Sequence, residues 1–299
     1  MRKTERLTRR GFLASSIAIA TTMELQRAAR ALGFASNAEV CKLMAEQEVG
    51  PYYVADELLR SDIVEGKAGV PLSLKIAVLD VRTCKPLQNV AIDIWHCDAE
   101  GIYSGFVSQS MMGPGGPPPG FDAQHPDRQG PPPGPPPGGP VGRGGPPPQN
   151  HPTDKLTFLR GIQMTDADGA VRFRTVFPGF YMGRTNHIHF KVRLGGHVGD
   201  KTYAAGHISH TGQVFFPEEF AAKLMEHEPY SRHKIHRTTQ SEDDVFGDQH
   251  GELSIARLKP LGDAAGYEAE LVTAVDPTAT PGPAERRGGF GGPPAQGHS

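Results

Sequence analysis

The chain has 299 residues, 37% of them hydrophobic, and a formal net charge of −2, so its composition allows a folded core of one or two domains. This nearly balanced charge argues against a nucleic-acid partner, because such a partner requires a basic surface. No apolar stretch reaches the roughly 18–20 residues that span a bilayer, so we expect no membrane span.

The first 35 residues predict an export signal. Arg9 and Arg10 precede a short, weakly hydrophobic run that continues to Met23, which resembles a twin-arginine signal peptide. Charged residues at the end of this run, Glu24 among them, leave an uncleaved amphipathic helix as an alternative. We therefore expect residues 1–35 to direct the protein to the periplasm or the cell exterior.

Residues 38–275 predict one domain that is mainly β-structure. Alternating apolar and polar residues indicate half-buried strands, at 72–80, 89–97, 158–165, 170–177, 187–194 and 252–258. The DADG sequence at 166–169 predicts a hairpin turn between two of these strands. Helical signals are confined to 38–46 and 217–227. The pattern predicts an all-β fold, a β-sandwich of mostly antiparallel strands with few short helices.

Two segments lack the apolar residues that a core requires. Fifteen of the 28 prolines fall between Pro114 and Pro148, so we expect 113–150 to form a long disordered Pro/Gly-rich insertion in the domain. Residues 276–299 form a second Pro/Gly-rich stretch, which we expect to be a disordered tail. A surface insertion that docks a partner through its prolines is the alternative interpretation.

The three cysteines, Cys41, Cys84 and Cys97, fit an exported protein. Cys84 and Cys97 lie on either side of a predicted strand, and a bridge between them is one possibility; an odd count leaves one thiol free or allows a different pairing. No CxxC pair is present, which argues against a cysteine-based zinc site.

The stretch GRTNHIHF, residues 183–190, places two histidines on one predicted strand. Side chains at i and i+2 of a strand project from the same face, so His187 and His189 point together while Ile188 faces the opposite side. Two imidazoles on one face form half of a metal site, although surface histidines would give the same spacing. Two tyrosines follow predicted turns and can be directed at the same place: Tyr103 after DAEG and Tyr181 after Pro178-Gly179.

Four ordered motifs resemble the intradiol ring-cleaving dioxygenases, with most similarity to the β-subunit type of protocatechuate 3,4-dioxygenase and its exported relatives. The motifs are EVGPYYV (48–54), WHCDAEGIYSG (95–105), FLRGIQMTDADG (158–169) and PGFYMGRTNHIHFKV (178–192); QVFFPEEF and TTQSEDDVF are also similar to the family. In that family a β-sandwich holds a non-haem Fe(III) ion. The resemblance implies that the metal ligands here are Tyr103, Tyr181, His187 and His189. Hard phenolate donors also suit a ferric ion on chemical grounds.

The resemblance further implies the reaction and its substrates. A catechol-type aromatic diol would bind the iron, Tyr181 would leave the metal and act as the base, and Arg184 would stabilise negative charge on the substrate. O2 would then cleave the ring between the two hydroxylated carbons to give a cis,cis-muconate-type diacid, a step of aromatic compound catabolism. For Arg184, a surface salt bridge is the alternative interpretation.

Other features limit what the resemblance transfers. Only five residues separate Tyr181 from His187, which is shorter than in the protocatechuate enzymes, so the particular catechol is left open. The helical domain through which catechol 1,2-dioxygenases oligomerise is not evident, although an oligomer is possible. We expect Trp95 to belong to the core and we expect structural roles for His96, Asp98, His207 and His210. An exported metal- or ligand-binding protein without turnover is the alternative function, and a structural surface protein that uses its Pro/Gly segments is a third.

Overall fold

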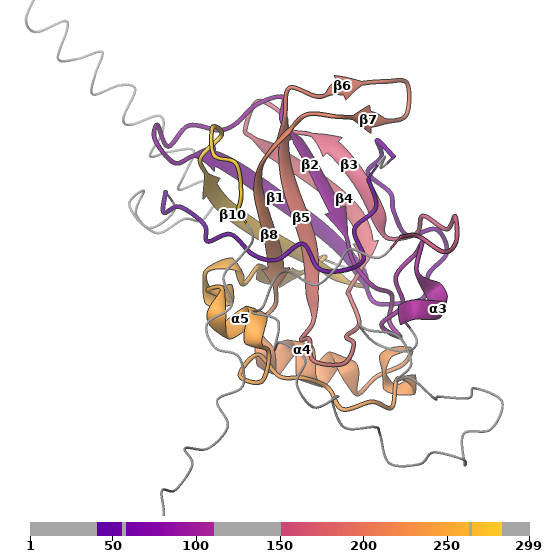
Figure 1. The fold of residues 1–299 in the computed structure, drawn as a ribbon. Coiled ribbons are helices and arrows are strands. Elements are labelled where there is room, and N and C mark those ends of the chain that lie inside the picture. The colour runs from indigo at the N-terminus through magenta and orange to yellow at the C-terminus, as the bar shows by residue number, and fades with distance from the viewer. Residues whose placement is uncertain (1–40, 56–57, 111–150, 263–264, 283–299) are drawn as a thin grey trace, which may run out of the picture. The chain divides into compact units, whose positions relative to one another are not determined.

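The structure, a computed structural model, describes residues 41–55, 58–110, 151–262 and 265–282 (Figure 1). The chain divides into two units, Met1–Lys42 and Leu43–Ser299, and the fold described below belongs to the second. The expected export signal (1–35) and Pro/Gly insertion (113–150) lie outside the described residues, as does most of the expected tail. The bounds of the export signal, the insertion and the tail therefore stay predictions.

Two four-stranded sheets form the body of this unit, which confirms the predicted β-sandwich (Figure 1). In order across the first sheet the strands are β4 (Ala170–Val176), β1 (Pro71–Asp80), β10 (Tyr267–Val275) and β9 (Arg257–Pro260). The order across the second sheet is β3 (Arg160–Met164), β2 (Ala91–Trp95), β5 (His187–Leu194) and β8 (His207–Phe215). All neighbouring strands are antiparallel except β1 and β10, which run parallel. A small hairpin pairs β6 (His197–Val198) with β7 (Tyr203–Ala204).

Successive side chains of a strand point to opposite faces of the sheet, so one face of β2 and β5 carries core residues and the other carries the two histidines. Apolar side chains on one face of β1, β2 and β5 fill a single core between the sheets, including Leu74, Ile76, Val78, Ile92, Ile94, Ile188, Phe190 and Val192. Each contributes roughly 1.5–3 kcal/mol when fully buried. The opposite face of β2 and β5 carries the remaining side chains, among them Trp95, His187 and His189, which pack outside this core cluster. The core therefore fixes the strand that bears both histidines.

Short helices lie beyond the ends of the strands: α3 (Val107–Ser110), α4 (Glu218–Met225), α5 (Asp244–Asp248) and the 3₁₀ turns Tyr230–Arg232 and Gly251–Ser254. The helix predicted over 217–227 is confirmed as α4, with Pro217 at its N-cap. The helix predicted over 38–46 is wrong in its described part. There the backbone is extended and bridges to β10, with the Met44 N–H donating to the Ala274 carbonyl at 2.9 Å.

Two predictions about strands are corrected. The turn at 166–169 exists, with the Asp166 carboxylate accepting from the Asp168 and Ala170 N–H groups, but it does not join a hairpin. It carries the chain from β3 in one sheet to β4 in the other, and alternation alone cannot show which partner a strand will pair with. The strand predicted over 252–258 begins only at Arg257, because Gly251–Ser254 forms a 3₁₀ turn and leaves Leu253 46% exposed.

The cysteines also differ from one expectation. Cys41 and Cys84 are disulfide-bonded. Cys97 is a buried free thiol beside Trp95 and Tyr103, so a Cys84–Cys97 bridge is wrong. Cys97 lies two residues after the end of β2 and packs in that aromatic cluster, whereas Cys84 follows the turn after β1.

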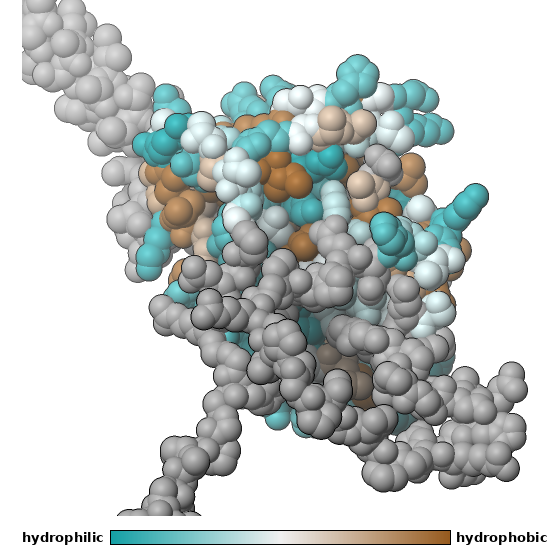
Figure 2. Space-filling model, viewed as in Figure 1, coloured by the Kyte–Doolittle hydropathy of each residue, from teal (hydrophilic) through white to brown (hydrophobic). Residues whose placement is uncertain are grey.

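The surface of the described residues is mixed. On the face shown in Figure 2, hydrophilic side chains gather around the β6–β7 hairpin, with apolar ones between them. The large apolar side chains that are exposed include Leu43, Leu156, Met182, Val198, Ile235 and Leu253. Among the residues described, no helix is both long and apolar enough to cross a membrane.

Candidate metal centre

Strand β5 brings the two predicted histidines together, as their spacing requires. The rings of His187 and His189 lie with their centroids 4.6 Å apart and nearly perpendicular, and their Nε2 atoms are 3.0 Å apart. Both residues are 1% exposed. His187 Nδ1 lies 2.7 Å from the Thr185 carbonyl oxygen, which can only accept, so this nitrogen carries the proton and Nε2 keeps its lone pair.

Two turns packed against each other supply the tyrosines. Tyr103 follows the turn at 98–101 and Tyr181 follows Pro178-Gly179. The Gly179 N–H donates to the Asp98 carbonyl at 3.1 Å, and a Cβ on Gly179 would lie 2.4 Å from that same oxygen. Likewise a Cβ on Gly101, whose φ is +80°, would lie 2.4 Å from the Phe180 carbonyl oxygen. Glycine at both positions allows the close approach that unites the two tyrosines.

The two phenols meet beside the histidines. The Tyr181 hydroxyl is 3.5 Å from His187 Nε2, and the rings of Tyr103 and Tyr181 meet edge to face with centroids 5.7 Å apart. The hydroxyl of Tyr103 is buried and has no hydrogen-bond partner within the described parts of the chain. A third phenol, Tyr52, stacks on Tyr103 at 4.7 Å and lies 6.0 Å from Tyr181.

Burial keeps these groups neutral while no cation is bound. It raises the pKa of Tyr103 well above its usual range, helped by nearby Tyr181 and Cys97, and it raises that of Tyr181 against the opposing charge of Arg184. Burial, followed by neighbouring cationic groups, lowers the pKa of both His187 and His189 well below the usual value. Neutral imidazole is the form that binds metal, and a cation would favour ionised phenols.

Arg184 lies within this cluster and is 7% exposed, so a surface salt bridge is wrong for it. Its Nε is 3.1 Å from both carboxylate oxygens of Asp243, and its Nη1 is 3.5 Å from the Tyr181 hydroxyl. Burial, the largest single effect, lowers the pKa of Arg184, but the nearby acidic groups, Asp243 first and then Tyr181 and Glu48, together raise it. Arg184 is therefore a permanent cation beside Tyr181. Gln213, fully buried on β8, accepts a further hydrogen bond from the Arg184 guanidinium.

Several of these neighbours were not selected from the sequence: Tyr52, Gln213 and Asp243. Tyr52 and Asp243 belong to segments that resemble the family, EVGPYYV and TTQSEDDVF, and Gln213 opens QVFFPEEF. Membership of such a segment is the signal that could have indicated them.

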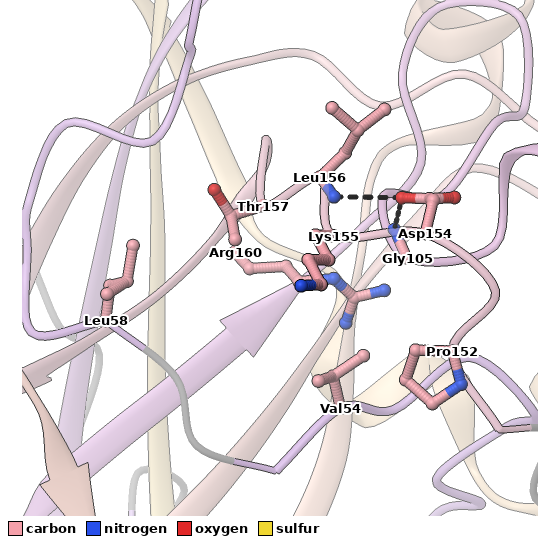
Figure 3. A pocket seen from close by; sticks show the side chains of 9 residues that line it. All are labelled: Val54, Leu58, Gly105, Pro152, Asp154, Lys155, Leu156, Thr157 and Arg160. Atoms are coloured by element: carbon pink, nitrogen blue, oxygen red, sulfur yellow. Dashed lines mark hydrogen bonds between the residues drawn. The ribbon is translucent and has the colours of Figure 1, made fainter.

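Arg160 supports the tyrosine side of the cluster from strand β3. Its buried guanidinium donates to the Tyr52 carbonyl at 2.8 Å and to the carbonyl and hydroxyl of Ser104. It also lines a small pocket of about 110 Å³ (Figure 3), where Asp154 accepts from the N–H groups of Gly105 and Leu156. None of the residues lining this pocket is a predicted metal ligand, so the pocket is distinct from the histidine and tyrosine cluster.

The four residues expected to have structural roles, His96, Asp98, His207 and His210, each contact other groups of the protein. His96 is buried, with Nδ1 2.8 Å from the Cys97 carbonyl and Nε2 2.7 Å from the Thr175 hydroxyl. Asp98 accepts from two N–H groups of its own turn and from Lys67. His207 contacts a backbone carbonyl, and His210 pairs with Glu46. Trp95 is fully buried, as expected for a core residue, and in addition stacks on His189.

The donor set fits a hard trivalent cation. The Nε2 atoms of the two imidazoles and the Tyr181 hydroxyl converge. The buried Tyr103 hydroxyl beside them has no hydrogen-bond partner in the described residues, although buried polar atoms ordinarily have one. No group of three or more His, Cys, Asp and Glu side chains is placed to hold a metal in the ranges that the structure describes. The donors gathered beside the two histidines are therefore phenols, which are hard oxygen ligands.

Comparison with family models and with curated proteins finds no match, whereas comparison with solved structures does. Crystal structures of a dioxygenase and of an intradiol ring-cleavage dioxygenase from Tetranychus urticae are each 30% identical to this chain, with TM-scores of 0.62. Both similarities extend over 81% of this chain. They extend over 97% of the first relative's chain and 98% of the second's. The dioxygenase domain of a dioxygenase–carbohydrate-binding protein fusion from Streptomyces sp. SirexAA-E is 23% identical, with a TM-score of 0.46, covering 79% of this chain and 99% of its own.

Both of the 30%-identical structures that share this β-sandwich are dioxygenases, and this similarity supports a dioxygenase enzyme. The chain belongs to the intradiol ring-cleavage dioxygenase family.

Proposed function

We propose that this protein binds non-haem Fe(III) through Tyr103, Tyr181, His187 and His189. We further propose that it cleaves a catechol-type aromatic diol with O2, between the two hydroxylated carbons, to a cis,cis-muconate-type diacid. The observation that carries this proposal is the convergence of two neutral imidazole Nε2 atoms and the Tyr181 hydroxyl, beside a buried Tyr103 hydroxyl that lacks a partner in the described residues. Family membership supports the reaction class.

Ferric iron, when bound, would supply Lewis acidity that draws electron density from a bound diolate and makes a ring carbon reactive toward O2. The residues of this chain supply the rest. Tyr181, ionised once a cation is bound, would be the base that takes the substrate proton, and the Arg184 guanidinium lies 3.5 Å from its hydroxyl. Arg184, kept ionised by Asp243, also stabilises negative charge on the diolate.

We infer that Tyr103 would stay fixed while Tyr181 takes up the substrate proton. Its ring is fully buried beneath Tyr52 and its backbone N–H donates to Ser110 at 3.0 Å. The Arg160 guanidinium holds Ser104, the next residue, from the other side. The two phenols would thus have different roles, one structural for the metal and one in proton transfer.

The test is iron content, visible absorption and O2 uptake of the purified protein against a panel of catechols, with the product identified as a diacid. We expect stoichiometric iron, a red-brown tyrosinate-to-Fe(III) absorption band and O2 uptake with at least one catechol. Tyr181→Phe and His189→Ala should each lower uptake by more than about 100-fold, because loss of even an outer partner of a ligand costs 10- to 100-fold.

Tyr230→Phe is the matched control, because this tyrosine is equally buried but bonds to the Phe177 carbonyl in the main core. Its iron content and colour should equal those of the wild type. Unchanged uptake in His189→Ala would remove it from the ligand set. Iron and colour without uptake of O2 would indicate a metal-binding protein without turnover, and a colourless zinc protein would contradict the ferric site.

We also propose export to the periplasm or cell exterior. The paired arginines Arg9 and Arg10 support it, and so does the disulfide bonding of Cys41 and Cys84, which persists in oxidising compartments. Recovery of the protein from the cytoplasm of fractionated cells, with reduced cysteines, would contradict this location.

A further inference from the structure

The two proposed histidine ligands are held in different ways. His187 has the usual outer partner, a carbonyl oxygen 2.7 Å from its Nδ1, which fixes both its tautomer and the plane of its ring. His189 Nδ1 is buried and has no hydrogen-bond partner in the described parts of the chain. No hydrogen bond from the described residues therefore orients this ring through Nδ1.

Trp95 provides that orientation by stacking. The indole and the His189 imidazole are parallel, with an interplanar angle of 2° and centroids 4.9 Å apart. The contact follows from strand register, because Trp95 on β2 is the direct cross-strand partner of His189 on β5. Side chains directly opposite in an antiparallel pair share a face and touch. Both residues are almost completely buried, at 0% and 1% exposed.

Packing fixes the indole in turn. Trp95 Nε1 has no hydrogen-bond partner among the described residues, so polar contacts do not hold it. The Tyr53 ring packs on it at 4.8 Å, and Lys191 Nζ lies 3.1 Å from the Tyr53 centroid and 5.6 Å from that of Trp95. On the His189 ring itself, a Cβ at Gly50 would come within 3.2 Å of Cε1 and 3.3 Å of Nε2. Little space is left for this ring to turn.

We propose that Trp95 is the positioning residue for His189, and that ring stacking takes the place of the outer hydrogen bond that His187 has. This inference rests on the proposed function, since it treats His189 as a ligand. It makes the two imidazoles unequal donors, because an outer acceptor raises the basicity of His187 and stacking gives His189 no such increase. Trp95 thus has a role beyond the core role expected from the sequence.

The first test uses the full chain without metal. In ¹H–¹³C NMR spectra of the imidazole groups, the indole ring current should move the His189 ring protons upfield of those of an unstacked imidazole. Trp95→Phe keeps an aromatic ring and should retain part of this shift, whereas Trp95→Leu should abolish it. If the leucine variant does not fold, Trp95→Met fills more of the space without a ring and replaces it.

The second test measures iron retention against a chelator together with the energy of the tyrosinate-to-Fe(III) band. Trp95→Leu should lose iron affinity by roughly 10- to 100-fold and shift the band, and Trp95→Phe should stay within a few-fold of wild type. Phe177→Leu, which removes a fully buried ring from the main core, is the control for packing loss and should change neither the band nor the His189 protons.

The outcomes separate the inference from the proposed function. Wild-type chemical shifts and iron affinity in Trp95→Leu would overturn the inference, as would equal effects of Phe177→Leu. Failure of the wild type to bind iron would overturn the proposed function instead, and the metal-free spectra would still decide whether Trp95 orients His189.

Discussion

Arg184 is the residue that most directly couples the candidate metal centre to its surroundings. Its Nε contacts both oxygens of Asp243 at 3.1 Å, and the same carboxylate accepts the N–H groups of Val245 and Phe246 at the start of α5. Burying a lone guanidinium would be costly, and this carboxylate offsets that cost. The pair thus fixes a cation 3.5 Å from the Tyr181 hydroxyl.

We expect Arg184→Lys to lower kcat for O2 uptake by roughly 100-fold while iron content stays at the wild-type level, because a lysine keeps the charge but not the fork of donors. Steady-state kinetics and iron analysis on the same preparation check this. Arg174→Lys, in which an arginine exposed to solvent and paired with Asp62 is changed, should leave both quantities unaltered. A variant that has lost its iron would assign Arg184 to metal binding and contradict its role beside Tyr181.

The sequence predicted the side chains of this site better than their neighbours. The i, i+2 spacing of His187 and His189 is a local property of a strand, so the pairing of their rings could be predicted. The meeting of Arg184 with Asp243, 59 residues along the chain, depends on where α5 packs, so the similarity of TTQSEDDVF to the family could indicate Asp243 but not its partner. Tyr52 was missed for the same reason, because its contact with Tyr103 joins distant parts of the chain.

The two turns that carry Tyr103 and Tyr181 behave as one structural unit. The turn at 98–101 is closed by the Asp98 carboxylate, which accepts from the N–H groups of Glu100 and Ile102. The second turn docks on it through the Gly179 N–H. Without side chains at Gly101 and Gly179 the backbones touch, so the distance between the phenols is set by main-chain contact.

Gly179→Ala should therefore separate the turns. Its Cβ would stand 2.4 Å from the Asp98 carbonyl oxygen and 2.8 Å from backbone atoms of Ala99, which cannot move as a side chain could. We expect a loss of about 1–3 kcal/mol in the free energy of unfolding, measured with urea, and a loss of bound iron. Gly247→Ala, at a position in α5 where nothing lies within 4 Å, should instead keep its iron and be as stable as the wild type or more so. Equal destabilisation by both changes would contradict the docking argument.

Strand existence was easier to predict than strand partnership. β1, β4 and β5 match alternating patterns almost residue for residue, because each has one apolar face on the core. β8 was missed because His207–Phe215 carries polar side chains that are buried by other segments, such as Gln213 under Gln47 and Glu48. Nothing in 158–177 indicates that its two strands belong to different sheets.

His96 connects the two sheets and makes stability depend on pH. It follows β2, and its Nε2 lies 2.7 Å from the hydroxyl of Thr175 on β4. Burial, against smaller opposing effects from the Cys97 carbonyl and Asp98, lowers its pKa to about 4. The unfolded chain therefore binds more protons than the folded one between the ordinary histidine pKa of about 6.5 and about 4, and stability falls as pH falls through this window.

We expect the free energy of unfolding of the wild type to decrease between pH 6.5 and 4 by up to about 1.4 kcal/mol per pH unit from this residue. His96→Gln, although less stable at neutral pH, should show a shallower slope in urea titrations across the window. His197→Gln, on the exposed strand β6, is the control with the wild-type slope. Parallel slopes for all three proteins would mean that His96 does not govern acid sensitivity.

The place of β10 in its sheet has a consequence for biosynthesis. β10 lies between β1 and β9 and pairs in parallel with β1, Leu72 opposite Tyr267. While the nascent chain still lacks Tyr267–Val275, β1 has only β4 beside it, β9 has nothing to pair with, and the first sheet cannot close over the second. Assembly of this sandwich therefore depends on pairing two segments that lie far apart in the chain, and we expect this non-local contact to make folding slow.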